Sequence, residues 1–411
     1  MNPIRLLTFS TLFPNAEQPN HGIFVQNRLR HLLAGGEAVS TVVAPVPYFP
    51  FGSRRFGAWS AYARVARQEM RHGLTVHHPR FPVIPKVGMN LAPRLLYHAC
   101  APFIAGLIAK GARFDAIDAH YVYPDGVAAF WLGQRFGLPV VITARGTDIS
   151  LIPDFPTPRR MIQAALTGAA GLVGVSESLR QAMIRLGVAP DNVVTLRNGV
   201  DTTMFRPMDR EAARVGLGLT RPTLISVGHL IERKGHHRTI EAMHRLPEFD
   251  LIVVGEGPER AALQAKIGQG GLSARVRLLG NRPHAELPSL YSAADAMILA
   301  SSREGWANVL LESMACGTPV VASNIWGNPE VVQSATAGVI YEPNTPEGIV
   351  TGVNRLFAQL PDRGATRAYA ERFSWDATTA GQLALFRRVI AVRMTPGGAL
   401  PGLSPPPGKA R

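Results

Sequence analysis

The chain has 411 residues, which is too long for one ordinary hydrophobic core and favours two domains of about 150–200 residues each. Hydrophobic residues make up 46% of the chain and charged residues 18%, a balance that excludes an intrinsically disordered protein. The formal net charge is +14, and residues 1–200 carry 20 Lys and Arg against 10 Asp and Glu, so the first half should attract phosphate-rich partners such as nucleotides, nucleic acid or anionic lipid.

Short apolar runs alternate with helix-length amphipathic segments along the whole chain, which predicts βαβ units and parallel sheets. In the first half, strands are expected at residues 4–11, 39–46, 74–81, 116–121, 140–144, 171–175 and 193–196. In the second half, they are expected at residues 223–227, 249–254, 276–278, 296–300, 319–322 and 338–341. Residues 4–11 are interpreted as a buried strand and not as a signal peptide, because no small-residue cleavage pattern follows them.

Two segments of the first half raise the question of a membrane. Residues 91–109 are the most membrane-like, but their uninterrupted apolar part is only about ten residues, well under the roughly 20 that a span needs, which favours a buried or interfacial helix. A second segment mixes Arg with aromatic residues, as is typical of a helix lying on anionic lipid, although a solvated helix with one buried face explains it equally well. Its members are Phe51, Arg54, Arg55, Phe56, Trp59, Tyr62, Arg64, Arg67 and Arg71.

A domain boundary is expected near residues 201–220, where the strand pattern pauses around Pro207, Gly216 and Gly218. At the other end of the second half, residues 396–411 contain five prolines and four glycines, which predicts a disordered tail.

The most informative segment is residues 301–319, SSREGWANVLLESMACGTP. A strand runs into a loop with Glu304 and Gly305, and a helix follows over residues 307–315. Open α/β sheets bind ligands beyond the carboxyl ends of their strands, and helix N-termini there present free N–H groups to anions. A diphosphate is therefore expected at the amides of Asn308, Val309 and Leu310.

Glu304 and Glu312 are eight residues apart, one before this helix and one within it, so they can reach different parts of one ligand. A carboxylate accepts paired hydrogen bonds from adjacent hydroxyls, which suits a ribose or a hexose. Two such glutamates alone would more often be a first-turn acid and a solvated helical residue. The flanking strand, Gly305 and Asn308 favour the ligand interpretation here.

Two further strand ends in the second half open helices. In residues 227–235, Gly228 lets the backbone approach a ligand, and Arg233 and Lys234 can neutralise a diphosphate. Taken alone, this motif is explained more simply by two charged side chains that face solvent before a helix. Residues 254–259, VGEGPE, make a tight turn with Glu256, but Arg260 replaces the third glycine of a dinucleotide fingerprint, so the motif argues little for NAD.

The first half offers three loops at strand ends: His21-Gly22 before a helix at residues 23–33, His120 within residues 118–126, and residues 143–148. A lone histidine is more often structural than catalytic. His120 is a stronger candidate because it is predicted at the carboxyl end of a strand.

Several patterns are absent from the sequence. There is no Asp-x-Asp, no Cys/His metal set and no Gly-x4-Gly-Lys-Ser/Thr, and the two cysteines, Cys100 and Cys316, form no disulfide framework. We therefore expect no metal and no cofactor, with phosphate charge met by Arg, Lys and helix dipoles, and a reducing cytoplasmic location.

With these residues in place, the chain resembles the family 4 retaining glycosyltransferases of the GT-B fold, of the group 1 type found in exopolysaccharide and lipopolysaccharide synthesis. The matching stretches are dense between residues 226 and 342 and include 228 with 234–235, 254–259, 279–280, 290–295, 304–319 and 329–331, together with 198–201 and 373–375 outside that range. The resemblance implies an α/β protein with two Rossmann-like domains facing across a cleft. It divides the chain into an acceptor domain (1–203), a donor domain (204–372) and a helix (373–395) that crosses back to the first domain.

The resemblance also implies roles for the matching positions. Glu312 would bind the donor ribose, Glu304 the sugar hydroxyls, and Lys234 the diphosphate with the amides of residues 308–310. His120 would contact the sugar, and Gly22 would mark a glycine loop near the phosphate and acceptor. Arg233, Gly228, Glu256 and Leu279 complete the expected donor site. Many family members carry Arg where this chain has His229, so either His229 or Arg233 takes that place.

The expected function is metal-independent transfer of a sugar, with retention, from a nucleoside diphosphate sugar to a glycan or lipid-linked acceptor in cell-surface polysaccharide synthesis. The enzyme would be cytoplasmic or peripheral on the inner membrane face. Two alternatives stay open: a nucleotide-sugar 2-epimerase of related fold, for which no acid/base set around C2 can be assembled, and a nucleic-acid binder, for which no recognised basic-aromatic module is visible.

Overall fold

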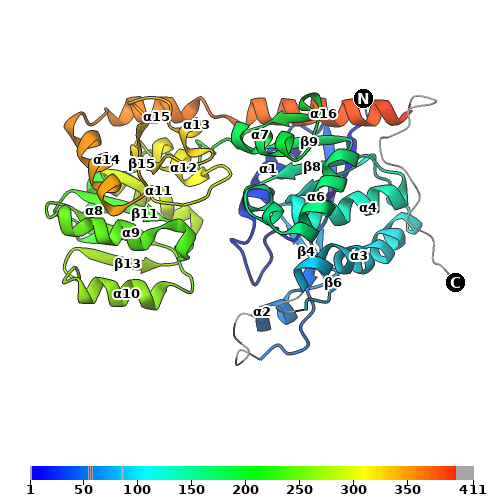
Figure 1. Ribbon diagram of the computed structural model, residues 1–411, viewed down its shortest axis with the longest axis horizontal. Coiled ribbons are helices and arrows are strands. Elements are labelled where there is room, and N and C mark those ends of the chain that lie inside the picture. Colours follow the sequence, from blue (N-terminus) through cyan, green and yellow to red (C-terminus); the bar gives the residue numbers. More distant parts are fainter. Residues whose placement is uncertain (1, 54, 56, 58, 85–87, 395–411) are drawn as a thin grey trace. The chain divides into compact units, whose positions relative to one another are not determined.

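The computed structural model describes residues 2–53, 55, 57, 59–84 and 88–394. The predicted tail at residues 396–411, and Arg54 and Phe56 of the predicted interfacial helix, lie outside the described residues. The chain forms two compact units, one from Met1 to Arg197 together with the C-terminal segment from Asp376, and one from Asn198 to Trp375 (Figure 1). This division falls a few residues before the boundary expected at 203/204.

In its described part, the first unit contains an eight-stranded sheet with helices on its faces (Figure 1). The strand order is β10-β9-β8-β7-β1-β2-β5-β4, and only β4 runs antiparallel to its neighbour. The bounds are β1 Ile4–Phe9, β2 Ala38–Val43, β4 Gln68–Arg71, β5 Leu74–His77, β7 Ala116–His120, β8 Val140–Ala144, β9 Gly171–Gly174 and β10 Val193–Thr195. A small second sheet pairs β3 (Val46–Pro47) with β6 (Arg80–Phe81). The order reverses between β1 and β7, which makes their carboxyl ends the switch point where such sheets bind ligands.

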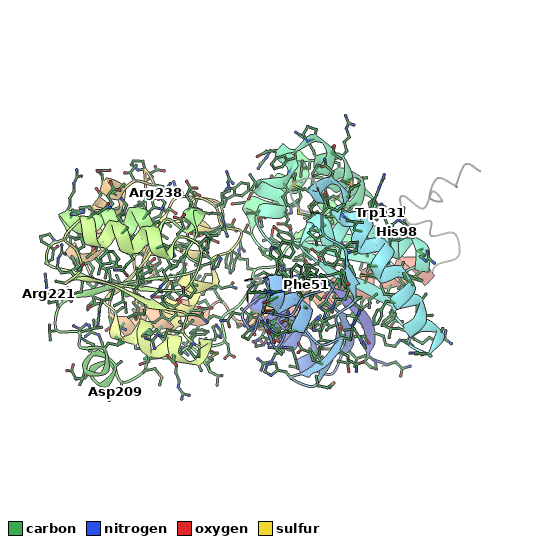
Figure 2. The ribbon with its side chains drawn as sticks, turned by 90° about the horizontal axis from the view of Figure 1, so that it is seen from below. Phe51, His98, Trp131, Asp209, Arg221 and Arg238 are labelled. Atoms are coloured by element: carbon green, nitrogen blue, oxygen red, sulfur yellow. The ribbon has the colours of Figure 1, made fainter. Side chains whose placement is uncertain are left out.

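The helices of the first unit connect these strands. They are α1 Ile23–Ala34, α2 Trp59–Arg64, α3 Ala92–Ala109, α4 Val127–Phe136, α5 Thr147–Ser150, α6 Pro156–Gly168, α7 Glu177–Arg185 and α16 Trp375–Met394. Helix α3 buries Leu96, Cys100 and Ile104, a stripe at spacing four that faces the domain. Its Tyr97 meets Trp131 of α4 edge-to-face at 6.1 Å between ring centroids. Trp131 is labelled in Figure 2.

The second unit contains a six-stranded parallel sheet of order β13-β12-β11-β14-β15-β16. Its strands are β11 Thr223–Val227, β12 Asp250–Val254, β13 Val276–Gly280, β14 Ala296–Leu299, β15 Val320–Ser323 and β16 Gly338–Tyr341. Its α-helices are α8 Arg210–Leu217, α9 His236–Ala242, α10 Arg260–Gln269, α11 Leu287–Ala293, α12 Asn308–Ala315, α13 Asn328–Val331, α14 Pro346–Ala358 and α15 Arg363–Glu371. Here the order reverses between β11 and β14. All the strands predicted for this half form, each within two residues of its expected bounds.

Two expectations for the first half are wrong in detail. The predicted strands at 39–46 and 74–81 each break into two short strands, because the chain leaves the main sheet to form the β3–β6 pair. The Arg-rich segment is not one helix: α2 ends at Arg64, and residues 68–71 form β4. A turn at His72 and Gly73, both with positive φ, allows β4 to pair antiparallel with β5.

The C-terminal helix α16 belongs to the first unit from Asp376 onward (Figure 1). Leu385, Phe386 and Val389 enter the same hydrophobic cluster as strands β1, β2 and β9. The buried guanidinium of Arg28 on α1 donates to Gln382 Oε1 at 2.9 Å and to the carbonyl of Leu196 at 3.0 Å. A buried arginine with these two partners ties the last helix to the first.

Candidate functional site

The switch point of the second sheet brings together residues from two segments that lie far apart in the chain. Arg233 and Lys234 follow β11, and Ser301 and Glu304 follow β14. Because β11 and β14 are neighbours with parallel directions, their carboxyl ends open at the same edge of the sheet. The site residues therefore meet through sheet topology.

At this edge, Lys234 and Glu304 form a close ion pair. Lys234 Nζ lies 2.6 Å from Glu304 Oε1, which also accepts from Ser301 Oγ at 2.7 Å. Arg233 Nη1 lies 3.8 Å from Glu304 Oε2 and donates to the carbonyl of Arg303 at 2.8 Å. Burial disfavours the ionised carboxylate, but the charges of Lys234 and Arg233 and the hydrogen bonds from Lys234 and Ser301 outweigh burial, so the pKa of Glu304 lies below its ordinary value. Glu304 is thus an anion held beside two cations.

Gly235 makes this approach possible. Its φ is +72°, and a Cβ at this position would lie 2.0 Å from the carbonyl oxygen of Ala300. Only glycine allows the turn between Lys234 and α9 to pass so close to the end of β14. The glycine after Lys234 is therefore required by the position of its neighbour.

Glu312 belongs to a second cluster, on the helix that follows. Its Oε2 accepts from Tyr291 Oη at 3.1 Å, and its Oε1 lies 3.7 Å from His284 Nε2. Burial lowers the pKa of His284, but the hydrogen bond and charge of Glu312 and the charge of Asp201 outweigh burial, so the net shift is upward. Glu304 and Glu312 have different neighbours and can bind different parts of one ligand.

Helix α12 begins at Asn308, one residue after the start expected at 307, and has no side-chain cap and no acid in its first turn. Asn308 Oδ1 accepts from Asn198 Nδ2 at 3.1 Å, and Trp306 Nε1 donates to the carbonyl of Asn198 at 3.1 Å. These contacts fix the loop before α12 with Gly305 buried inside it. The positive end of the helix dipole is left for an anion.

The remaining predicted donor residues are spread along the edge of the sheet. Gly228 follows β11, and Val309 and Leu310 continue the first turn of α12. Glu256 follows β12, is exposed and pairs with Arg260 at 2.9 Å, while Leu279 lies in β13, the edge strand. Glu256 and Leu279 therefore lie apart from Glu304, nearer the end of the sheet. Of the two candidates for the missing arginine, His229 is exposed, whereas Arg233 Nη1 lies 3.8 Å from Glu304 Oε2.

In the first unit, His120 ends β7 at the switch point of its sheet. Its Nε2 lies 3.1 Å from Asp118 Oδ2 and its Nδ1 lies 2.7 Å from Arg145 Nη2. Burial, with the charges of Arg145 and Arg28, lowers the pKa of His120, and the charge and hydrogen bond of Asp118 oppose that shift only in part. His120 is a neutral imidazole in a buried charged cluster.

Gly22 caps α1 at the other side of this switch point, after β1. Its φ is +70°, and a Cβ would lie 2.3 Å from the carbonyl of Leu12, so the loop after β1 folds tightly onto the start of α1. Thr11 in that loop donates its N–H and its hydroxyl to Asp125. Burial and the charge of Asp148 raise the pKa of Asp125 to about 7 against the effect of those hydrogen bonds.

Comparison with known proteins places these clusters in a family. Residues 208–373 match the family described as glycosyl transferases group 1, and residues 60–204 match glycosyltransferase family 4. The D-inositol 3-phosphate glycosyltransferase of Acidothermus cellulolyticus is 31% identical over 336 residues, which cover 72% of this chain and 73% of that protein. The protein of the same name from Mycobacterium bovis is 30% identical over 325 residues, covering 73% and 67%.

The chain belongs to glycosyltransferase family 4. The predicted resemblance, the enzyme class and transfer from a nucleoside diphosphate sugar are confirmed at the level of this family. The fold of the glycosyltransferase is similar to that of sucrose-phosphate synthase from Thermosynechococcus elongatus (TM-score 0.76, 21% identity, 95% of this chain and 99% of that chain). It is also similar to HepE from Anabaena in complex with UDP and glucose (TM-score 0.72, 20% identity, 94% and 100%). The predicted GT-B fold is confirmed by these similarities.

Several contacts in these clusters could not be predicted from the sequence. Ser301, Asp118 and Arg145 lie in segments predicted to be at strand ends. No local pattern predicts the hydrogen bond of Ser301 to Glu304, or those of Asp118 and Arg145 to His120. Tyr291 and His284 reach Glu312 from the segment before β14. They lie on different elements from Glu312, so periodicity within one helix or strand does not reveal the contacts, and only the folded chain shows them.

Within the described ranges, no three His, Cys, Asp or Glu side chains gather in a way that could hold a metal ion. One described segment of the glycosyltransferase, Gly88–Ala109, is long and apolar enough to cross a membrane by length and composition alone, and only a minor part of it is buried.

Proposed function

We propose that this glycosyltransferase holds its nucleoside diphosphate sugar in the second unit, with the diphosphate at Lys234, Arg233 and the N-terminus of α12. The observation that carries the proposal is the Lys234–Glu304 pair, which joins the two strand ends at the switch point. Glu304 binds the sugar hydroxyls and Glu312 binds the ribose diol, because each ionised carboxylate accepts two hydrogen bonds. His120 is proposed to contact the transferred sugar.

Donor binding exchanges one partner of Lys234 for another. Without donor, Lys234 is neutralised by Glu304. A bound diphosphate replaces Glu304 as the ion-pair partner of the Lys234 ammonium. Glu304 then accepts hydrogen bonds from sugar hydroxyls and continues to accept from the hydroxyl of Ser301. As the bond from the anomeric carbon to the phosphate oxygen breaks, Lys234 and Arg233 stabilise the charge that develops on the leaving phosphate.

We propose retention of the anomeric configuration. The acceptor oxygen attacks from the face that the phosphate leaves, the departing phosphate oxygen takes the acceptor proton, and the new glycosidic bond keeps the configuration of the broken one. Glu304 is held by Lys234 and Glu312 by Tyr291, so the pair is arranged for binding and not as the acid and nucleophile of a glycosidase.

The same cations support metal-independent transfer. Lys234 and Arg233 are adjacent in the chain and both lie near Glu304, which is in the loop that leads to the uncapped start of α12, and together they can match the charge of a diphosphate. We expect full turnover after exhaustive treatment with EDTA. Activity that disappears with EDTA and returns with Mg²⁺ or Mn²⁺ would refute this part of the proposal.

For the acceptor, we propose a lipid-linked glycan at a membrane surface, as in cell-surface polysaccharide synthesis. The support is a series of exposed apolar side chains along residues 48–91 of the first unit, here called the apolar cluster, which includes Phe51, labelled in Figure 2. The members of this apolar cluster are Tyr48, Phe51, Trp59, Met70, Val83, Ile84, Met89 and Leu91, all in one stretch of the chain. Arg55 and Arg94 lie in the same stretch and suit an anionic surface.

A thermal-shift screen with UDP-, GDP- and ADP-sugars tests donor binding. One nucleotide class should raise the melting temperature, and the matching donor should release its nucleoside diphosphate when an acceptor is present. Acceptor arms should include a lipid-linked glycan and, because curated relatives bear that name, D-inositol 3-phosphate. Donor incubated without acceptor tests the 2-epimerase alternative, since an epimerised sugar would appear there. Tight binding of RNA with no response to any donor would revive the nucleic-acid alternative.

Vesicle sedimentation tests the membrane proposal. The enzyme should sediment with vesicles that contain anionic phosphatidylglycerol and less with neutral phosphatidylcholine, and salt should weaken the difference. The variant Phe51→Ser with Trp59→Ser should lose binding. A matched control, Phe155→Ser, changes an exposed aromatic residue outside the apolar cluster. Wild-type enzyme that stays in the supernatant at low salt would refute the proposal.

A further inference from the structure

The imidazole of His120 is enclosed by charged groups from three elements. Asp118 lies two residues earlier on β7, Arg145 follows β8, and Arg28 comes from α1. His120, Asp118 and Arg28 each expose only 1% of their surface. Because the ring is enclosed, the contacts of its two nitrogens determine which nitrogen carries the proton.

The contact with Arg145 assigns the tautomer of His120. Arg145 Nη2 lies 2.7 Å from His120 Nδ1, and a guanidinium can only donate, so Nδ1 must accept and carries no proton. In the neutral ring the proton is then on Nε2, which donates to Asp118 Oδ2 at 3.1 Å. A proton on Nδ1 would set two donors against each other.

The loop that carries Arg145 is itself held in place. Asp148 accepts from the N–H groups of Arg145 and Gly146 and from that of Val122, directly after the β7 turn. Tyr121 donates to or accepts from Thr147 at 2.7 Å in the same loop. The charged groups that face His120 are therefore Asp118 on β7, Arg145 after β8 and Arg28 on α1, with Asp148 behind Arg145.

We propose that Asp118 and Arg145 are positioning residues of the transfer reaction, which hold His120 as the neutral Nε2–H tautomer with both ring nitrogens occupied. With both ring nitrogens occupied, His120 neither takes nor gives a proton during transfer. The carbonyl of His120 accepts from Ser10 Oγ at 3.1 Å, which also fixes the end of β7. The inference rests on the proposed contact between His120 and the sugar.

The tautomer is tested on the free enzyme by nitrogen-15 NMR of labelled histidine, with His120 assigned from the spectrum of His120→Gln. We expect the Nε2–H pattern and no titration between about pH 5 and 8, the range of ordinary histidines. An Nδ1–H pattern, or titration of His120 in that range, would overturn the proposal. Because no donor is present, this outcome is independent of the donor assignment.

Kinetics separate positioning from general structural support. Arg145→Met removes the donor to Nδ1 and leaves Asp118 beside a ring that can now be protonated, so kcat should fall at least about tenfold and acquire a new decline toward acid pH. Arg145→Lys keeps a donor and should restore most of kcat and the wild-type pH profile. The dissociation constant for UDP should not change in either variant, because the proposed donor contacts lie in the second unit.

Asp118→Asn should likewise lower kcat with an unchanged UDP dissociation constant. The matched control is Asp115→Asn, which makes the same substitution just before β7, where Asp115 pairs with Arg5 at 2.6 Å, and should leave kcat unchanged. Circular dichroism verifies that each variant is folded. If Arg145→Met is folded and has the wild-type kcat and pH profile, the proposal is wrong. If no donor is turned over by the wild type, the proposed function fails while the NMR result on the tautomer still stands.

Discussion

Lys234 and Glu304 are 70 positions apart in the chain, yet the ammonium of one lies 2.6 Å from the carboxylate of the other. They meet because β11 and β14 are hydrogen-bonded neighbours although β12 and β13 lie between them in sequence. The side chains of Lys234 and Glu304 are 16% and 9% exposed. Removal of either partner thus affects both the unliganded fold and the proposed donor site.

Lys234→Ala should therefore have two measurable effects. It leaves Glu304 as a largely buried carboxylate without its closest cation, which should lower the free energy of unfolding in urea. It should also lower kcat by about 10²–10³, the range for loss of one preorganised group at a developing charge. Lys266→Ala is the matched control, since Lys266 pairs with Glu241 at 2.8 Å on the surface. Equal effects of the two substitutions would rule out the proposed diphosphate role.

Glu312→Gln tests the ribose contact. Hydrogen bonds to a charged group contribute about 1.5–3 kcal/mol, so the dissociation constant for the nucleoside diphosphate should rise by about 10- to 150-fold. Isothermal titration calorimetry with UDP, or the base found in the screen, gives this value. Glu347→Gln, at an exposed pair with Arg245, should bind like the wild type. Unchanged affinity in Glu312→Gln would remove Glu312 from the site.

His284 should make stability depend on pH. Burial lowers the pKa of His284, but Glu312 and Asp201 raise it more, so the folded protein binds this proton more tightly than the unfolded chain. The stabilisation is fully present below the unfolded pKa of about 6.5 and is lost as pH rises through the higher folded value. The difference in unfolding free energy between wild type and His284→Gln should therefore shrink from about pH 6 to 8. A difference that grows with pH would contradict the assignment.

Two glycine substitutions should change stability in opposite directions. Gly235→Ala places a Cβ 2.0 Å from the Ala300 carbonyl at a φ of +72°, so the turn beside Lys234 must move and both stability and donor affinity should fall. Gly216→Ala, in helix α8 with open space around its Cβ, should raise the free energy of unfolding by about 0.5–1 kcal/mol. Thermal unfolding of both variants checks the pair, and a stable Gly235→Ala with full donor affinity would refute the steric argument.

Much of the second unit could be predicted from local patterns. Residues 223–227 and 338–341 form strands with the expected bounds, and α12 begins one residue after its expected start at 307. These segments are apolar, short and bounded by turns, so their local preference agrees with their tertiary environment. In the first unit, the prediction of one helix for the Arg-rich segment was wrong. A mixture of Arg and aromatic residues does not distinguish a helix on lipid from a short helix followed by an edge strand.

The amino-acid sequence alone determined the residue types and their local placement: acids before and within α12, a lysine and an arginine before Gly235, and a histidine at the end of a strand. Only the tertiary structure decided which of them touch. Ser301 with Glu304, Tyr291 and His284 with Glu312, and Asp118 and Arg145 with His120 depend on strand order and on loop paths. Local periodicity carries information about one element at a time, whereas the pairing of distant strands is set by how all elements bury their apolar faces together.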